Sequence, residues 1–260
     1  MRLRYAAPLF VMLMVCSLHG QQPTPPANGT APAAAPPANG GAPAAAKREA
    51  QGIASPFTLS EADQKRLDQL LTHWERRSSA VKTYSCTFQR FEYDMVFGPE
   101  DPNVHKTQAE GIIRYSAPDK GEFNVTRLGK NPDFKMEAVS HVEHWICDGN
   151  SVFELNPQKQ QLIEQKLPES MKGQQIADGP LPFMFGAKKD KLIARYWIRE
   201  IKPPENRPNE YWIEAFPRTR ADAVNFAMVR VILDQKTFLP NALQVFPPNY
   251  HPKNNPSRMS

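Results

Sequence analysis

The sequence has 260 residues and a formal net charge of +5, from 32 Lys and Arg against 27 Asp and Glu. A surplus this small, without a basic cluster, does not match a nucleic-acid-binding surface, and we expect no nucleic acid partner. The length allows one large domain or two small ones. The class of function therefore has to be read from the motifs along the chain.

Residues 1–20 have the pattern of a secretory signal peptide. Arg2 and Arg4 precede an apolar run over residues 6–15, and small residues ending at Gly20 form a cleavage site. The apolar run is too short for an ordinary membrane span. We therefore predict that the protein is exported to the periplasm.

The cysteines leave two questions open. Cys16 lies just behind the apolar run, where bacterial lipoproteins are acylated, but Val15 does not fit the residue that usually precedes such a cysteine. Lipid anchoring at Cys16 is the alternative to a freely exported protein. Cys86 and Cys147 lie among apolar strand residues, so they are either joined by a disulfide, as exported proteins allow, or kept as two buried thiols.

Residues 21–57 are predicted to be a disordered tether. Pro and Ala dominate this stretch, and few large apolar side chains are available there for a core. The polar tail over residues 248–260 is also predicted to be disordered. The folded domain is expected to span residues 58–247.

The clearest helix is predicted over residues 59–81. Ser60 can cap its first turn, and Glu61 and Asp63 suit the positive end of the helix dipole. Apolar residues recur along it at spacings near three and four and form one stripe, which is expected to lie on a sheet. They are Leu67, Leu70, Leu71, Trp74 and Val81.

Residues 144–166 have the pattern of three short strands folded back on themselves. Asp148-Gly149 supplies the positive φ of a tight hairpin turn, and Asn156-Pro157 begins a second turn. Strands this short, joined by turns this tight, predict an antiparallel meander. The other strands are expected to extend this sheet on both sides.

Strand-like segments follow the helix in series and predict a mainly β domain. Their ranges are 84–97, 111–116, 122–128, 139–147, 151–155, 162–167, 192–201, 211–216, 225–233 and 242–246. One sheet of about ten strands must coil toward a barrel or fold over as a sandwich, because strand twist accumulates. We expect the helix and an apolar, lid-like segment over residues 168–191 to cover its concave side. Such a shape leaves an apolar hollow that can hold a ligand.

Motifs of known catalytic and metal sites are absent from the sequence. There is no Gly-x-Ser-x-Gly, no phosphate-binding glycine loop, no Cys-x-x-Cys and no His-Glu-x-x-His. His141, His144 and Cys147 do not form a local metal site, because a strand turns His144 to the opposite face and separates the other two by about 20 Å. We expect no metal, no cofactor and no enzyme. A hydrolase whose site joins distant residues is the remaining alternative.

Aromatic residues are spread over nearly every predicted strand. For any single residue the plain interpretation is core packing, but together they would suit the lining of a cavity for an acyl chain. The candidate ligand-binding residues are Phe88, Ile113, Tyr115, Phe123, Trp145, Phe153, Phe183, Met184, Trp197, Trp212 and Phe226.

Several stretches, in the right order, resemble the periplasmic outer-membrane lipoprotein carriers (LolA). Residues 81–89 (VKTYSCTFQ) are similar to the first strand of that family, and residues 111–120 to its second strand and turn. Residues 148–161 resemble its central hairpin, residues 182–185 (PFMF) its lid helix, and residues 234–240 a late turn. More closely, the chain resembles an uncharacterised LolA-like lineage of planctomycete bacteria that also pairs a secretion signal with a Pro/Ala-rich tether.

The resemblance implies an incomplete, strongly curved antiparallel β-barrel of about ten strands, with helices closing its concave side and a cavity that receives acyl chains. It also implies a gating arginine at Arg114 or a neighbour. The chain departs from the family in a longer first hairpin, residues 94–108, and in an extended late loop, residues 218–224.

The leading hypothesis for function is a non-enzymatic periplasmic carrier that binds lipid or lipoprotein acyl chains. The alternative is an interaction or stress-sensor module on the same fold, which binds another envelope protein through its outer surface or a sheet edge. We expect a monomer, with a peripheral membrane contact as an option. A carrier needs a continuous apolar hollow, whereas a sensor can have that space filled by side chains.

Overall fold

The computed structural model describes residues 52–94, 97–101, 103–130, 132–139, 142–156, 160–167, 188–248 and 250, together with the backbone of residues 17–18. The helices described are α1 (Glu61–Ser79), α2 (Lys189–Arg195) and α3 (Arg220–Ala223). The strands described are β1 (Ser17–Leu18), β2 (Thr83–Glu92), β3 (Thr107–Ser116), β4 (Lys120–Lys130), β5 (Glu137–Ala138), β6 (His144–Cys147), β7 (Ser151–Asn156), β8 (Gln161–Lys166), β9 (Tyr196–Ile201), β10 (Glu210–Pro217), β11 (Met228–Asp234) and β12 (Pro240–Phe246).

Several sequence predictions fall outside these residues. They are the signal peptide apart from the two residues of β1, the tether up to residue 51, most of the lid-like segment with Phe183 and Met184, and the tail beyond residue 250. Among the described helices, none combines the length and the hydropathy that crossing a membrane requires.

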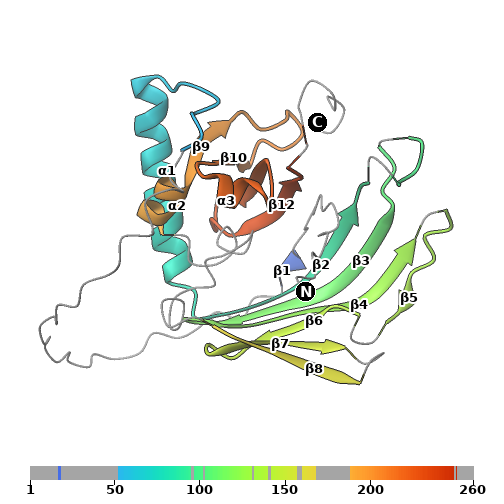
Figure 1. Cartoon of the computed structure of the whole chain (residues 1–260). Coiled ribbons are helices and arrows are strands. Elements are labelled where there is room, and N and C mark those ends of the chain that lie inside the picture. Colours follow the sequence, from blue (N-terminus) through green and yellow to red (C-terminus); the bar gives the residue numbers. More distant parts are fainter. Residues whose placement is uncertain are drawn as a thin grey trace, which may run out of the picture.

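The strands form two antiparallel sheets. The first sheet has the order β1-β2-β3-β4-β6-β7-β8, with β5 paired to β4, and the second has the order β12-β11-β10-β9 (Figure 1). The prediction of a mainly β, antiparallel domain with few helices is therefore confirmed. The prediction of one sheet that extends on both sides of residues 144–166 is wrong, because β9–β12 form a separate sheet and β8 is the last strand of the first sheet among the described residues. The chain enters the second sheet from α2, which directly precedes β9.

Helix α1 confirms the clearest sequence prediction. Ser60 is its N-cap, and its Oγ accepts a hydrogen bond from the backbone N–H of Asp63 at 3.1 Å. The helix ends at Ser79, so Val81 lies just beyond it. The remaining apolar residues of the predicted stripe are all buried: Leu67, Leu70, Leu71 and Trp74.

The meander of β6, β7 and β8 is also confirmed. Gly149 has a φ of 95°, which is the positive value that the Asp148-Gly149 turn predicts. Asp148 Oδ1 accepts hydrogen bonds from the backbone N–H groups of Asn150 and Ser151, both at 2.8 Å. These bonds fix the turn, and β6 and β7 pair directly across it.

The predicted strand over residues 192–201 is half wrong. Its first part is the end of α2, where the backbone N–H of Leu192 bonds to the carbonyl of Lys188 at 2.9 Å. Strand β9 begins only at Tyr196. An apolar run this short fits a buried helix turn as well as a strand, and in this run packing decides between the two.

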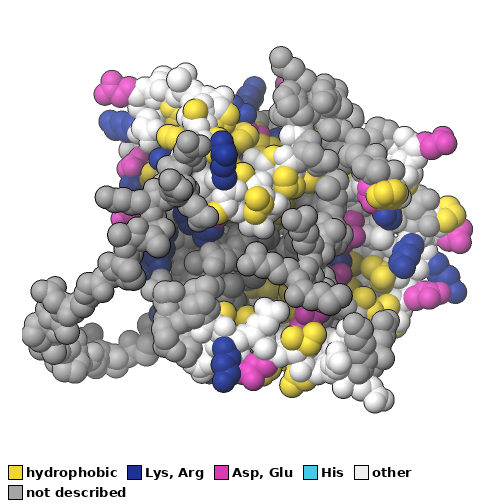
Figure 2. All heavy atoms as spheres, in the orientation of Figure 1, with side chains coloured by type: hydrophobic (Ala, Val, Ile, Leu, Met, Phe, Trp, Pro, Cys, Tyr) yellow, Lys and Arg dark blue, Asp and Glu magenta, His cyan; other side chains and the backbone are white. Residues whose placement is uncertain are grey.

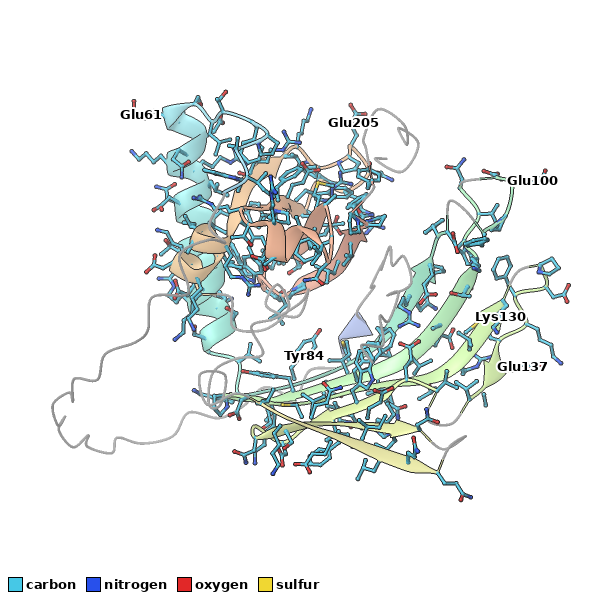
Figure 3. All side chains as sticks on the ribbon, in the orientation of Figure 1. Glu61, Tyr84, Glu100, Lys130, Glu137 and Glu205 are labelled. Carbon is cyan, nitrogen blue, oxygen red and sulfur yellow. The ribbon has the colours of Figure 1, made fainter. Side chains whose placement is uncertain are left out.

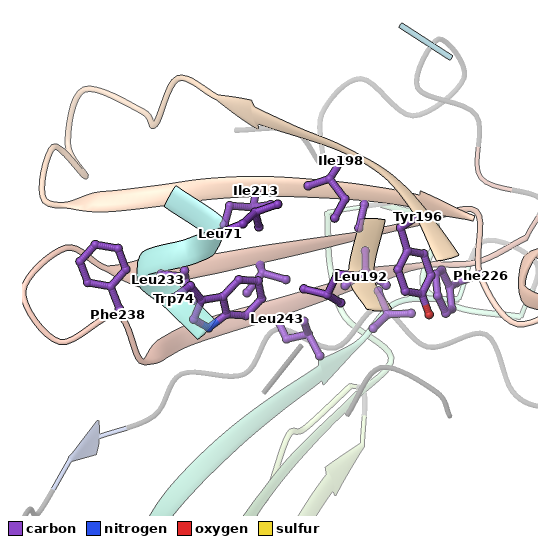
Figure 4. Packing of buried hydrophobic residues seen from close by; sticks show 14 of the residues in the cluster. Leu71, Trp74, Leu192, Tyr196, Ile198, Ile213, Phe226, Leu233, Phe238 and Leu243 are labelled. Atoms are coloured by element: carbon purple, nitrogen blue, oxygen red, sulfur yellow. The ribbon is translucent and has the colours of Figure 1, made fainter. Parts of the chain in front are cut away.

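Helix α1 lies on one face of the second sheet, as Figure 4 shows. Side chains alternate along β10, so that Ile213 belongs to the same buried core as Leu71 and Trp74 of the helix, whereas Trp212 belongs to a separate cluster. Burying each large apolar side chain of this kind stabilises the fold by about 1.5–3 kcal/mol. The helix stripe and the sheet therefore stabilise one another.

The opposite face of the second sheet carries buried charges. Glu214 accepts hydrogen bonds from Arg199 at 2.8 Å and from Arg230 at 2.7 Å, and Arg230 also donates to Gln244 at 3.0 Å. The guanidinium of Arg230 lies 5.3 Å from the ring centre of Trp212. We call Arg199, Glu214, Arg230 and the neutral Gln244 the Arg–Glu network. Each of its three charged residues has a partner, which is the condition under which burial of charge is tolerated.

The long strands of the first sheet curve, and their concave side faces α1 and the second sheet (Figure 1). Figure 3 shows Glu100, Lys130 and Glu137 at the end of this sheet that is remote from α1. Tyr84, at the start of β2, lies on the side that faces α1. The buried core contains residues from α1 and from both sheets.

Candidate functional site

The candidate site is the face of the first sheet that contributes to the buried core. We call it the inner face, and its buried residues are Cys86, Phe88, Ala109, Ile113 and Val125. Burial alternates along β2, as expected of a strand with one buried face. The sequence shows the same alternation, since polar residues separate the buried ones.

Three aromatic residues form a continuous row across the inner face. The rings of Phe88 and Phe123 stack with centres 4.7 Å apart, and those of Phe123 and Trp145 with centres 5.5 Å apart. Phe123 pairs with both Ile113 and Trp145, so that all three lie on one face. Exposure rises along the row from 1% at Phe88 to 42% at Trp145. The aromatic row (Phe88, Phe123 and Trp145) thus runs from the core to the solvent.

Gly111 makes the first stacking contact possible. A Cβ atom at this position would lie 2.6 Å from the ring of Phe88 and 2.2 Å from the carbonyl oxygen of Asn124. Gly111 pairs with Phe88 on one side and with Val125 on the other. The ring of Phe88 therefore occupies the space that a side chain on β3 would take, and it reaches Phe123 across that strand.

A buried ion pair lies beyond the buried end of the aromatic row. Arg90 donates two hydrogen bonds of 2.6 Å to the carboxylate of Glu143, and its Nε lies 2.9 Å from Glu92. Burial alone would lower the pKa of Arg90, but the bond to Glu143 and the charge of Glu92 outweigh it and raise that pKa. Sequence reasoning missed this pair, although Arg90 shares the alternation phase of Cys86 and Phe88.

Cys86 and Cys147 are both buried, at 4% and 6% exposure. Cys86 lies on β2 and Cys147 on β6, with β3 and β4 between them. Three strand spacings separate them by about 14 Å, which is too far for a disulfide. Cys147 donates a hydrogen bond to the carbonyl of Asp119 at 3.2 Å, and burial raises the pKa of its thiol. Of the two alternatives left by the sequence, the structure has the buried thiols.

The predicted ligand-binding residues divide into groups. Those on the inner face are Phe88, Ile113, Tyr115, Phe123 and Trp145, and Phe226 belongs to the same buried core. Phe153 pairs with Ile146, so it lies on the opposite face of the first sheet. Trp212 lies on the network side of the second sheet, with Trp197 on the same face. The structure therefore brings five of the predicted residues together on one sheet face.

Arg114 does not lie on the inner face. Its side chain is exposed and donates a hydrogen bond of 2.6 Å to Glu122, which also bonds to His144 at 3.0 Å. Burial alone would raise the pKa of Glu122, but these two bonds outweigh it and lower that pKa. Arg114 therefore does not take the position that the family resemblance implies for a gating arginine. The arginine on the inner face is Arg90.

The described residues were also compared with the donor sets of metal sites and with the charges seen in Figure 2. Among the described residues, no group of three or more His, Cys, Asp and Glu is placed to hold a metal ion. His144 is bound to Glu122, and His141 lies outside these residues. Figure 2 shows basic, acidic and hydrophobic side chains interspersed on the face it presents. The aromatic row is therefore the feature of the inner face on which a function can be argued.

Comparisons with known proteins give little beyond this geometry. No family model and no curated protein matches the chain. A chain from the structure of the CwlD amidase from Clostridioides difficile in complex with the GerS lipoprotein matches 72% of this chain and 86% of its own length. The identity is 14% and the TM-score is 0.26, so this likeness supports no argument on activity or ligand.

The expectation that the chain is not an enzyme is corrected at this point. The matching solved structure contains an amidase, and the likeness to it does not show that this chain is an enzyme. The same structure is a complex with a lipoprotein, which is a protein partner of that assembly. We draw no conclusion on catalysis for the present chain.

Proposed function

We propose that this protein binds the acyl chains of lipids or lipoproteins on the inner face of its first sheet. The proposal includes export to the periplasm and a strongly curved, incomplete barrel of the LolA type, with the helices on its concave side. The observation that carries the proposal is the aromatic row, which is stacked without a break and becomes steadily more exposed toward Trp145.

An acyl chain is the ligand that such a row suits best. Flat apolar rings in contact offer a strip that fits a narrow hydrocarbon, and each Å² of apolar surface removed from water contributes about 25 cal/mol. The open end of the strip carries Trp145 and Ile163, which both pair with Glu154 on the intervening strand and therefore share the inner face. A chain entering there reaches Phe123 and then Phe88.

The test is a pair of substitutions at neighbouring positions with similar exposure. Trp145 is 42% exposed on the inner face, and Ile146 is 36% exposed on the opposite face. We expect Trp145→Lys to abolish co-purification of acyl lipids, measured by native mass spectrometry with lipid extraction, while Ile146→Lys retains it. Wild-type protein that takes up neither natural lipids nor labelled fatty acids would refute the proposal.

A second candidate function is favoured by the edge of the first sheet. In the described part of the chain, β8 has a partner strand on one side only, and all six of its residues are exposed, with Leu162 at 63%. Leu167 donates to Asn150 at 2.8 Å, so the alternate residues Leu162, Glu164 and Lys166 direct their backbone groups to the open edge. An envelope protein could add a strand here.

The two candidates respond to different substitutions. Glu164→Pro removes an outward backbone donor and leaves the backbone hydrogen bonds between β7 and β8 in place. It also removes the side-chain bond that Ser151 Oγ donates to Glu164 at 2.7 Å, so Glu164→Ala is the control for that loss. We expect Glu164→Pro to lose any stable protein partner isolated with the wild type, and to keep acyl binding. Trp145→Lys should show the reverse pattern. If each variant loses both acyl binding and the protein partner, the inner face and the edge of β8 do not have separate functions.

A further inference from the structure

The core holds a hydrogen-bond donor that nothing described in the protein satisfies. The indole Nε1 of Trp74 is buried and has no hydrogen-bond acceptor in the part of the chain that the structure describes. The side chain as a whole is 1% exposed. A buried tryptophan N–H usually finds a partner, because leaving it without one costs stability.

The surroundings of Trp74 explain why no partner is present. The ring lies among Leu71, Leu233 and Leu243, as Figure 4 shows. These residues belong to the same buried core as Phe88 and the other residues of the inner face. Trp74 and the buried end of the aromatic row therefore belong to one apolar cluster.

The chemistry of an indole N–H restricts what could bind to it. The group donates one hydrogen bond and accepts none, so the ligand must offer an acceptor such as a carbonyl oxygen. A carboxylate would bring a charge, and a buried charge needs a counterion. The buried cation of the inner face, Arg90, is already held by Glu143 and Glu92. A neutral carbonyl is the acceptor that fits.

We propose that Trp74 donates its indole hydrogen bond to the ester or amide carbonyl of a bound acyl group. This inference rests on the proposed acyl-binding function and narrows its ligand to esterified or amide-linked chains in preference to free fatty acids. Trp74 then recognises the head of the chain, and the aromatic row holds its hydrocarbon.

The experiment compares two Trp→Phe variants of the full chain. Trp74→Phe removes the N–H and keeps an aromatic ring. Trp212→Phe is the matched control, because Trp212 is also buried but donates to Glu210 at 3.0 Å within the protein. The probes are methyl decanoate, decanoate, and an alkane with as many heavy atoms as the ester, each measured by equilibrium dialysis.

We expect Trp74→Phe to bind methyl decanoate about fivefold more weakly than wild type, the factor that one net hydrogen bond contributes. Binding of the alkane should change by less than about twofold, since its contacts are apolar. Decanoate should bind wild type more weakly than its ester. Trp212→Phe should bind all three probes as wild type does.

A spectroscopic measurement keeps the inference testable if a variant fails to fold. In wild-type protein labelled with nitrogen-15, the indole proton resonance of Trp74 should move downfield with the ester and stay in place with the alkane. Unchanged ester binding in Trp74→Phe, or an indole resonance that does not respond, overturns the inference and leaves the proposed function standing. Absence of binding to every probe by wild type overturns both.

Discussion

The second sheet and the last three strands of the first sheet are both short antiparallel meanders with many apolar residues, yet the second sheet is buried to a much greater extent. Every residue of β11 from Met228 to Leu233 is buried, whereas all of β8 is exposed. Trp212 on the second sheet is 7% exposed, against 42% for Trp145. A large apolar side chain on a strand is therefore not buried by its chemistry alone.

The difference lies in what covers each face. Helix α1 lies over one face of the second sheet, and on the other face Arg230 is enclosed between the rings of Trp212 and Phe246. Strands β6–β8 have no comparable cover among the described residues. The second sheet is thus built for stability, and the end of the first sheet keeps apolar side chains available for contact.

The largest expected effect tests the buried charges of the second sheet. Arg230→Leu leaves Glu214 buried with one partner fewer, and we expect a loss of about 3–5 kcal/mol in the free energy of unfolding. The matched control is Arg114→Leu, which breaks an ion pair with Glu122 on the exposed side of the first sheet. That variant should lose less than about 1 kcal/mol. Urea unfolding followed by circular dichroism measures both, and equal losses would contradict the comparison.

A smaller effect is expected inside the first sheet. Gly111→Ala forces a Cβ atom against the ring of Phe88 and the carbonyl of Asn124, and overpacking of this kind costs about 1–3 kcal/mol. Gly121→Ala is the control, because the nearest atom to its Cβ would be the carbonyl oxygen of Arg114 at 3.3 Å. Thermal unfolding by calorimetry should lower the melting temperature of the first variant more than that of the second.

The turn after β11 predicts a pH-dependent contribution. Asp234 accepts hydrogen bonds from the backbone N–H groups of Lys236 at 3.1 Å and Thr237 at 2.7 Å. Burial alone would raise the pKa of Asp234, but these bonds outweigh it and hold that pKa below the ordinary 3.8. A depressed folded-state pKa stabilises the protein above the unfolded pKa and loses this effect as the pH falls through the folded value.

Asp234→Ala should therefore lower the free energy of unfolding by about 1 kcal/mol at pH 7. The difference in the free energy of unfolding between wild type and variant should shrink as the pH falls below 3.8. In that range Asp234 becomes protonated in the unfolded protein and then in the folded protein. Urea unfolding at a series of pH values measures this gap. A gap that stays constant through this range would show that the hydrogen bonds of Asp234 do not depend on its charge.

The smallest effect is expected at β8. Leu162→Lys places a charge on a position that is already exposed, and the free energy of unfolding should change by no more than about 0.5 kcal/mol. The same urea measurement applies. A loss several times larger would show that β8 is covered, and the comparison between the two regions would fail.

Local signals accounted for the elements that the sequence predicted well. Ser60 and the apolar stripe defined α1, and Asp148-Gly149 defined the hairpin of β6 and β7, because a cap, a helical spacing and a turn dipeptide act within a few residues. The helical start of residues 192–201 was missed, since Leu192 fits a helix turn and a strand equally well.

The features that depend on distant residues could not be read in the same way. The division into two sheets, and the different burial of Trp145 and Trp212, follow from which elements lie over each face. The pair of Arg90 and Glu143 joins two residues that are 53 positions apart in the sequence. The sequence signal for a buried Arg90 is the alternation along β2, which puts Arg90 on the same face as the buried Phe88.

The four tryptophans of this chain are placed so that its fluorescence would report on each region separately. Trp74 and Trp212 are buried on the two faces of the second sheet, and Trp197 is stacked under the guanidinium of Arg218 at 3.7 Å. Trp145 lies on the first sheet and is open to solvent. Iodide should therefore quench Trp145 first. A ligand on the inner face would protect the fluorescence of Trp145 from iodide. The fluorescence of the buried Trp74 and Trp212 would not change with iodide in either case.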